Sequence, residues 1–246
     1  MAVSRLYGLI GRNIAYSFSR DYFTKKFAAE RRSDCDYVNF DIGDISEITE
    51  ITAKNPNLVG LNVTIPYKET VIPLLDSLSE DAKKIGAVNT IKIDGRGRLE
   101  GFNTDAYGFQ KSIGPLLQRH HQKALILGTG GASKAVAFAL ENLGIEFVFV
   151  SRNFSGTTIR YEDLESVFGG YQIIVNTTPV GTFPNIDDFP EIPYELFTPT
   201  HIAYDLIYNP AETAFLKKAK AFGAATKNGL EMLELQAEKA WEIWNP

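Results

Sequence analysis

The stretch from Lys123 to Gly144 restricts the possible fold of this chain more than any other part of the sequence. Ala124 to Leu127 is a short apolar run that suits a strand buried on both faces. Ala132 to Leu143, rich in Ala and Leu, suits a helix that stops at Gly144. A second apolar strand, Phe147 to Val150, follows directly. The sequence therefore predicts a strand–turn–helix–strand unit of a mostly parallel sheet.

The turn of this unit carries Gly128, Gly130 and Gly131, and in this setting a glycine pattern predicts a dinucleotide site. Bare backbone lets a pyrophosphate approach closely, and the start of the helix offers unpaired N–H groups and the positive end of the helix dipole. The third small position of the general fingerprint, usually Gly or Ala, is Ser133. The alternative is an ordinary tight turn that binds no ligand.

Composition and charge argue against several classes of partner. The 246 residues suit one large domain or two small ones, and a net charge of −5 without a basic block predicts no nucleic-acid or membrane partner. The single cysteine, Cys35, permits no internal disulfide and no thiolate metal cluster, so we expect no metal. No apolar run reaches transmembrane length and no signal-peptide pattern opens the chain, which predicts a cytoplasmic protein.

Strand and helix signals divide the chain near Asp105. The residues before it alternate between the two types and include a strong hairpin signal, Asp94-Gly95-Arg96-Gly97. The residues after it contain the glycine turn and a long loop, Pro179 to Pro199, of a kind that often binds or gates. The polar stretch at His120 and His121 predicts a solvated linker.

Two polar clusters follow predicted strands of the first unit. Asn62, Thr64 and Lys68 form one of them. The other consists of Asn89, Asn103 and Asp105. In open α/β sheets ligands lie off the carboxyl ends of strands, so the clusters could converge there. A Lys and an Asp that meet can transfer a proton to or from a reacting oxygen. The alternative is a solvated lysine and an aspartate that caps a helix.

Seven spaced motifs then resemble those of the shikimate dehydrogenase family. They come in the family's order and span nearly the whole chain, so together they are very specific although each alone is weak. The motifs are Ser17–Ser19, Asn62–Lys68, Gly86–Thr90, Gly101–Gly108, Gly128–Ser133, Asp205–Pro210 and Asn228–Gln236.

The resemblance implies reversible, NADPH-dependent reduction of 3-dehydroshikimate to shikimate, in aromatic amino-acid biosynthesis. It also implies the role of each matching residue. Lys68 and Asp105 would form the catalytic pair. Ser17 and Ser19 would hold the substrate carboxylate, with Tyr208 nearby. The ring hydroxyls would be bound by Asn62, Thr64, Asn89, Asp105 and Gln236, with Lys68 also in contact with the substrate. NADP would be bound by Gly128, Thr129, Gly130, Gly131, Ala132, Ser133, Ser151, Arg152, Asn153, Gly229 and Met232.

The implied fold is α/β, with an N-terminal α/β substrate domain and a Rossmann-like dinucleotide-binding domain whose sheet is mostly parallel. The substrate domain would comprise residues 1–104 completed by a C-terminal helix at 230–246, and the NADP-binding domain residues 105–229. The partner is a small-molecule substrate, and the protein is expected to be a monomer or a homodimer. A hydroxyl- and amide-rich lining suits a polyol acid in a protein without a basic patch.

The sequence also departs from the family pattern. Around the two serines, the positions that usually hold Pro, His and Pro are Asn13, Tyr16 and Arg20, so the serines are kept in an altered loop. At the tip of the second nucleotide strand, Ser151-Arg152-Asn153 replaces the usual Asn-Arg-Thr. No carboxylate lies there to bind a free ribose 2′-hydroxyl, whereas Arg152 can pair with a 2′-phosphate, so NADPH is expected over NADH.

Three other functions are alternatives. One is a dehydrogenase acting on both quinate and shikimate, and the second is a dehydrogenase of aminoshikimate. The third is a catalytically silent nucleotide-sensing module, which predicts loss of Lys68 or Asp105, and both residues are present. Because the pair Ser17 and Ser19 goes with shikimate in the resembled family, shikimate is expected to be preferred over quinate.

Overall fold

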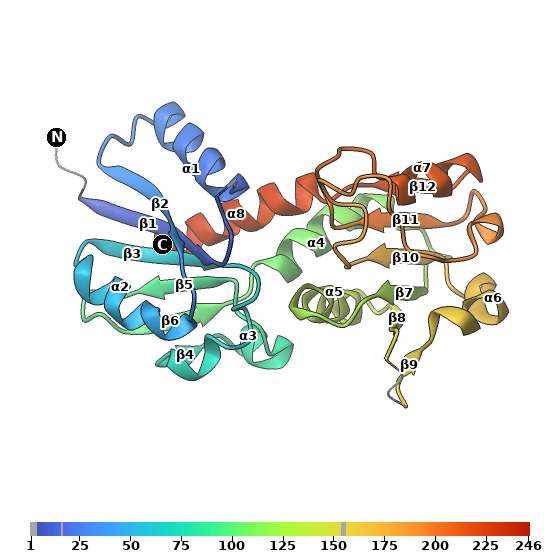
Figure 1. Cartoon of the computed structure of the whole chain (residues 1–246), viewed down its shortest axis with the longest axis horizontal. Coiled ribbons are helices and arrows are strands. Elements are labelled where there is room, and N and C mark those ends of the chain that lie inside the picture. The colour runs from blue at the N-terminus through green and yellow to red at the C-terminus, as the bar shows by residue number, and fades with distance from the viewer. Residues whose placement is uncertain (1–3, 16, 154–155) are drawn as a thin grey trace. The chain divides into compact units, whose positions relative to one another are not determined.

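The computed structural model describes residues 4–15, 17–153 and 156–246, so Tyr16, which flanks the serine loop, lies outside the described residues. The chain divides into two compact units (Figure 1). Unit 1 comprises Met1–Thr104 and Ala237–Pro246, and unit 2 comprises Asp105–Gln236.

Unit 1 is built on a mixed sheet whose described strands have the order β2-β1-β3-β5-β6-β4. β1 is parallel to β2 and β3, β5 runs antiparallel between β3 and β6, and β4 is parallel to β6. The elements are β1 (Arg5–Gly11), α1 (Phe18–Ala29), β2 (Cys35–Asp41), α2 (Ile48–Lys54), β3 (Leu58–Val63), β4 (Ser77–Leu78), α3 (Glu80–Ile85), β5 (Thr90–Ile93), β6 (Leu99–Phe102) and the second half of α8 (Leu230–Trp244).

Apolar side chains cover both faces of this sheet, because alternate residues of the central strand β1 belong to different clusters. Leu6 and Ile10 pack in a cluster with the aliphatic side chains of β3, β5 and α2. Tyr7 and Leu9 pack in an aromatic cluster with residues of α1, β2 and α8. A strand buried on both sides explains why Leu6 to Ile10 shows no alternation of apolar and polar residues.

The second half of α8 is part of the core of unit 1. Trp244 is 2% exposed, and its indole Nε1 donates to the carbonyl of Ile91 at 2.9 Å. Gly60 of β3 makes room for the indole, since a Cβ at Gly60 would lie 2.2 Å from Trp244 Nε1. The helix is thereby fastened to the sheet by a directional bond and by close packing.

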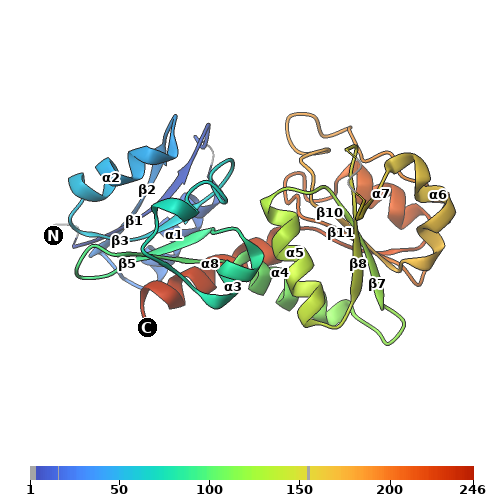
Figure 2. The same cartoon turned by 90° about the horizontal axis from the view of Figure 1, so that it is seen from below.

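Unit 2 is built on a sheet whose described strands are all parallel and have the order β12-β11-β10-β7-β8-β9. This is the doubly wound order, with β7 as its first strand and its reversal point between β7 and β10. The elements are α4 (Asp105–Ile113), β7 (Lys123–Leu127), α5 (Gly131–Asn142), β8 (Glu146–Val150), β9 (Thr158–Ile159), α6 (Leu164–Val167), β10 (Ile173–Asn176), β11 (Ile202–Asp205), α7 (Ala214–Ala221), β12 (Ala225–Lys227) and the first half of α8. Figure 2 shows α5 on one side of this sheet and α6 and α7 on the other.

One expectation from the sequence needs correction. The linker histidine His121 is not solvated: it is 7% exposed, and its Nδ1 accepts from the backbone N–H of Gln118 at 2.8 Å. Burial lowers the pKa of His121, so the ring is held neutral between the loops at this end of the sheet. The predicted long loop from Pro179 is anchored at its far end, where Ile192, Tyr194 and Phe197 pack into the core of unit 2.

Candidate active site

The end of β3 carries the first predicted substrate residue, Asn62, which is 4% exposed. Its Nδ2 donates to the carbonyl of Asn89 and to Oγ1 of Thr90, both at 3.3 Å, and its Oδ1 accepts from the Tyr37 hydroxyl at 2.7 Å. Because the amide is buried, these bonds fix its orientation and keep its polar atoms from costing stability.

Asn89 and Thr104 form a buried junction next to Asn62. The backbone N–H of Thr104 donates to Asn89 Oδ1 at 2.7 Å, and Asn89 Nδ2 donates to Thr104 Oγ1 at 3.0 Å. Asp105 follows Thr104 directly as the first residue of α4, and its side chain is buried. The junction therefore fixes the chain at the point where it enters α4.

Lys68 lies on the loop after β3, and its backbone is hydrogen-bonded to the segment that leads to Asn89. The N–H of Val88 donates to the carbonyl of Lys68 at 2.7 Å, and the N–H of Val63 donates to the carbonyl of Asn89 at 2.8 Å. Thr64 is held at the strand end by a bond from its own N–H to the carbonyl of Ile10 at 2.9 Å. The Asn62, Lys68 and Asn89 backbones thus lie at one edge of the unit 1 sheet, whereas Asp105 begins unit 2.

The serine pair lies at the start of α1. Ser17 is the N-cap residue and accepts from the N–H of Arg20 at 3.4 Å. Ser19 is buried and is hydrogen-bonded to the Tyr37 hydroxyl. Tyr37 therefore connects Ser19 with Asn62, and its complete burial raises its pKa, so the phenol stays neutral. Sequence reasoning missed Tyr37, because an aromatic residue inside a strand reads as core and only the fold reveals its two polar neighbours.

The glycine turn lies at the reversal point of the unit 2 sheet. Gly128 has φ +106°, and a Cβ there would lie 2.9 Å from Thr177 Oγ1 at the end of β10. Gly130 is the N-cap of α5 and supplies no side-chain cap, so the first N–H groups of the helix remain available to a ligand. Ser133, the unusual third position, is 1% exposed and donates to the carbonyl of Gly130 at 2.6 Å. The small side chain of Ser133 therefore fits at this buried position, and its hydrogen bond to Gly130 closes the turn.

The end of β8 brings the next predicted cofactor residues beside this turn, because β7 and β8 are paired in parallel. The N–H of Ser151 donates to the carbonyl of Ile159, and the N–H of Asn153 donates to Ser151 Oγ at 3.1 Å. Arg152 is exposed between them. Its positive charge acts on Tyr161, whose pKa is nonetheless raised by burial. The turn residues Gly128 to Ser133 and the tip Ser151 to Asn153 thus share the carboxyl edge of the sheet.

Asp205 organises the loop after β11 that carries Tyr208. Its Oδ1 accepts from Asn176 Nδ2 at 3.0 Å and from the N–H of Ile207 at 3.1 Å, and its Oδ2 accepts from Thr213 Oγ1 at 2.6 Å. Burial raises the pKa of Asp205 to about 6, although these bonds oppose the shift. The sequence motif contains Asp205, but nothing in the sequence shows that its carboxylate fastens two strand-end loops.

The start of α8 carries Gly229, Met232 and Gln236. The N–H of Gly229 donates to the carbonyl of Ile207 at 3.1 Å, and a Cβ at Gly229 would lie 2.1 Å from the carbonyl oxygen of Leu206. Met232 and Gln236 are buried, and Gln236 Nε2 donates to the carbonyl of Leu233 at 2.9 Å. Helix α4 packs against this part of α8 through Gly108, where a Cβ would lie 2.4 Å from the carbonyl oxygen of Met232.

Among the described residues, no group of three or more His, Cys, Asp or Glu side chains could hold a metal ion. In the same part of the chain, no helix has both the length and the apolar character needed to cross a bilayer.

Comparison with known proteins gives consistent results over the whole chain. Residues 9–91 match the model of the shikimate dehydrogenase substrate binding domain. A shikimate dehydrogenase (NADP(+)) of Carboxydothermus hydrogenoformans is 39% identical over 98% of this chain and 91% of its own length.

Solved structures agree with these sequence matches. A shikimate 5-dehydrogenase of Thermus thermophilus, in complex with NADP(H) and shikimate, has a TM-score of 0.86 at 31% identity, covering 98% of this chain and 93% of that one. A quinate dehydrogenase of Corynebacterium glutamicum, in complex with NAD, has a TM-score of 0.87 at 28% identity, covering 98% and 94%.

Proposed function

The chain belongs to the shikimate dehydrogenase family, and from this premise we propose how its own residues carry out the reaction. It is an NADP-dependent oxidoreductase that acts on a CH–OH group and interconverts 3-dehydroshikimate and shikimate in the shikimate pathway. Substrate binding is assigned to residues 1–104 with the C-terminal helix 230–246, and NADP binding to residues 105–229. Helix α8 would also contact the cofactor, through Met232 near its start.

The residues of unit 2 fit a dinucleotide. Gly128 leaves the approach to the turn clear of a side chain, and a Cβ at Gly130 would meet no described atom within 4 Å. The N–H groups at the start of α5 would hold the pyrophosphate, and Arg152 the 2′-phosphate. Gly229 and Met232 would face the nicotinamide. When bound, NADPH supplies a hydride to the carbonyl carbon of 3-dehydroshikimate.

Lys68 and Asp105 are assigned to the proton transfer. In the reducing direction, the Lys68 ammonium donates a proton to the carbonyl oxygen, which becomes the new hydroxyl, and neutral Lys68 takes the proton back in the oxidising direction. The role assigned to Asp105 is to orient the ammonium during this proton transfer. Ser17 and Ser19 bind the substrate carboxylate, near Tyr208. The ring hydroxyls are bound by Asn62, Thr64, Asn89, Asp105 and Gln236.

One observation carries this assignment more than any other: the buried hydrogen-bonded set of Asn62, Asn89 and Thr104 that leads into Asp105. Such a set, oriented before a ligand arrives, suits recognition of neighbouring hydroxyl groups. The test is absorbance at the nicotinamide band when purified protein meets shikimate and NADP. Absence of reduced cofactor with active, folded protein would contradict the proposed function.

The second candidate function, oxidation of quinate, is favoured by the likeness to the Corynebacterium enzyme. Quinate adds a hydroxyl at the carbon that carries the carboxylate, and an unpartnered hydroxyl in a closed site costs about 1–3 kcal/mol, or roughly tenfold to a hundredfold in efficiency. Comparing kcat/KM for the two acids, in wild type and in Ser19→Ala, decides between them. Equal efficiency on quinate would favour the second candidate.

Two further properties are proposals of the same kind. We place the enzyme in the cytoplasm, because a single buried thiol without a disulfide is typical of a reducing compartment. We expect a monomer or a homodimer, and light scattering coupled to size-exclusion chromatography measures which of the two is present. A larger assembly, or secretion of the native protein, would contradict these statements.

A further inference from the structure

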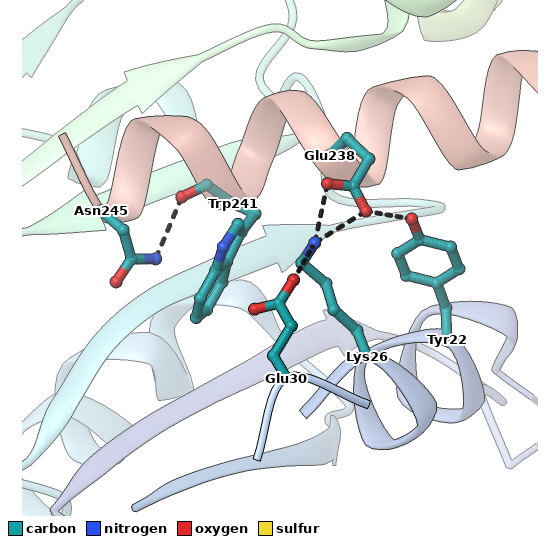
Figure 3. Close-up of polar contacts among 6 residues, drawn as sticks. All are labelled: Tyr22, Lys26, Glu30, Glu238, Trp241 and Asn245. Atoms are coloured by element: carbon teal, nitrogen blue, oxygen red, sulfur yellow. Dashed lines mark hydrogen bonds and ion pairs between the residues drawn. The ribbon is translucent and has the colours of Figure 1, made fainter. Parts of the chain in front are cut away.

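We propose that Glu238 of α8 is a positioning residue for substrate binding: together with Lys26 and Tyr22 it holds the serine-bearing start of α1 in place (Figure 3). The inference rests on the proposed role of Ser17 and Ser19 and deepens it. None of the three side chains belongs to a motif assigned to the reaction.

The contacts converge on one carboxylate. Lys26 Nζ donates to both oxygens of Glu238, at 3.0 and 2.8 Å, and the Tyr22 hydroxyl donates to Oε1 of the same group. Glu30 pairs with Lys26 at 2.8 Å from the next turn of α1. The Lys26 side chain is only 13% exposed, so its bonds to Glu238 are shielded from water more than those of an ordinary surface pair. Burial alone would raise the pKa of Glu238, but Lys26 and Tyr22 hold it below its ordinary value.

The ring contacts between these two helices are apolar and set no register. The rings of Phe27 and Trp241 are 5.5 Å apart between centroids, and those of Phe23 and Trp244 are also 5.5 Å apart. Apolar contact is non-directional, so a helix held by it alone can shift along its neighbour. The three hydrogen bonds to Glu238 restrict such a shift, because each has a preferred length and angle.

A shift of α1 would reach the substrate through the helix itself. Tyr22 and Lys26 lie one and two turns after Ser19 on the face that also includes the buried Phe23. Ser19 in turn bonds to Tyr37, which bonds to Asn62. Because α8 is fastened to the sheet at Trp244, Glu238 gives α1 a fixed reference within unit 1.

The test is steady-state kinetics of Glu238→Gln, which keeps the shape of the side chain and removes its charge. We expect KM for shikimate to rise about 3- to 10-fold, less than for loss of a charged hydrogen bond to the substrate itself because Glu238 acts through the serine, with kcat and KM for NADP nearly unchanged. Tyr22→Phe should raise the same KM by a smaller factor, and it remains informative if Glu238→Gln fails to fold. The control is Glu242→Gln, which breaks the ion pair to Lys239 on the same helix and should leave KM for shikimate unchanged.

A Ser19→Ala background separates this inference from the proposed function. If Glu238 acts through the serine, Glu238→Gln should add little to the KM of Ser19→Ala. An equal rise in both backgrounds, or an unchanged KM in folded Glu238→Gln and Tyr22→Phe, would overturn the positioning role. An unchanged KM in Ser19→Ala alone would instead overturn the role of that serine in carboxylate binding, and with it the basis of the inference.

Discussion

Lys68 and Asp105 are the residues on which the proposed chemistry depends most directly. Lys68→Ala should lower kcat by about 10²- to 10⁴-fold, the typical contribution of general acid–base catalysis, and leave NADP binding unchanged. Asp105→Asn should also be severely impaired, and the double variant should be far less than additive because the two groups act together. Steady-state or stopped-flow absorbance at the nicotinamide band measures kcat for each variant. A kcat near that of the wild type in either single variant is incompatible with the pair.

Arg152 should determine the choice between the two nicotinamide cofactors. It is exposed at the tip of β8, where no carboxylate is present at Ser151 or Asn153 to bind a ribose hydroxyl. Arg152→Ala should reduce kcat/KM for NADPH about tenfold or more, as for loss of a charge-assisted bond, and change the value for NADH little. An unchanged ratio of the two efficiencies would remove Arg152 from the cofactor site.

Asp205 should make the protein less stable as pH rises, whereas a carboxylate with a lowered pKa has the opposite effect. Its pKa in the folded protein is raised to about 6. Its contribution to the free energy of unfolding is therefore fully present below the pKa of the unfolded state, near 3.8, and is lost as pH rises through about 6. A shift of this size corresponds to about 3 kcal/mol. Asp205→Asn should remove this loss, so its free energy of unfolding relative to wild type should rise between pH 4 and pH 7. Denaturant titrations at both values measure the difference, and a constant difference would contradict the assignment.

The turn between β7 and α5 depends on Gly128. Gly128→Ala would force a side chain into a backbone with φ +106° and to 2.9 Å from Thr177 Oγ1, so NADP affinity should fall at least tenfold. Gly144→Ala is the control, because φ is +71° there but a Cβ would meet no described atom within 4 Å. It should cost about 1 kcal/mol of stability and leave NADP affinity unchanged. Isothermal titration calorimetry tests both, and equal effects on affinity would contradict the prediction.

Elements with strong local signals could be predicted from the sequence. The unit around the glycine turn is present as predicted, and so is the hairpin at Asp94, whose Oδ1 accepts from the N–H groups of Arg96 and Arg98. The strands β4, β9 and β12 could not be predicted. Each has two or three residues, too few for a period, and exists because a neighbouring strand pairs with it.

Contacts between residues distant in sequence also limited how much of the candidate site could be predicted. Residues in spaced motifs could be proposed from the sequence because their order along the chain carries the information. The roles of Tyr37 and Asp205 could not, although Asp205 lies in one of the motifs, because each depends on a partner distant in sequence: Asn62 and Asn176. Polar contacts of this kind depend on tertiary packing, to which local patterns give no access.

A substitution that destabilises the core of unit 1 should leave the NADP affinity of unit 2 nearly unchanged. Both tryptophans, Trp241 and Trp244, lie in unit 1. Gly60→Ala would displace the Trp244 indole and should destabilise unit 1 by about 1–3 kcal/mol, as overpacking does. The tryptophan fluorescence transition should move to lower denaturant, whereas NADP affinity should change less than about twofold. An unchanged fluorescence midpoint would show that the indole is not held as described.

The passage of α8 from unit 2 into unit 1 has a consequence for the order of events during translation. Unit 2 is one continuous segment, whereas unit 1 needs residues 237–246, which the ribosome adds after all of unit 2. At about 5–20 residues per second, synthesis of unit 2 takes about 7–26 seconds, and during that time the N-terminal segment lacks the helix that fills its aromatic core. We therefore expect nascent unit 1 to keep one apolar face of its sheet uncovered until residues 237–246 have been added.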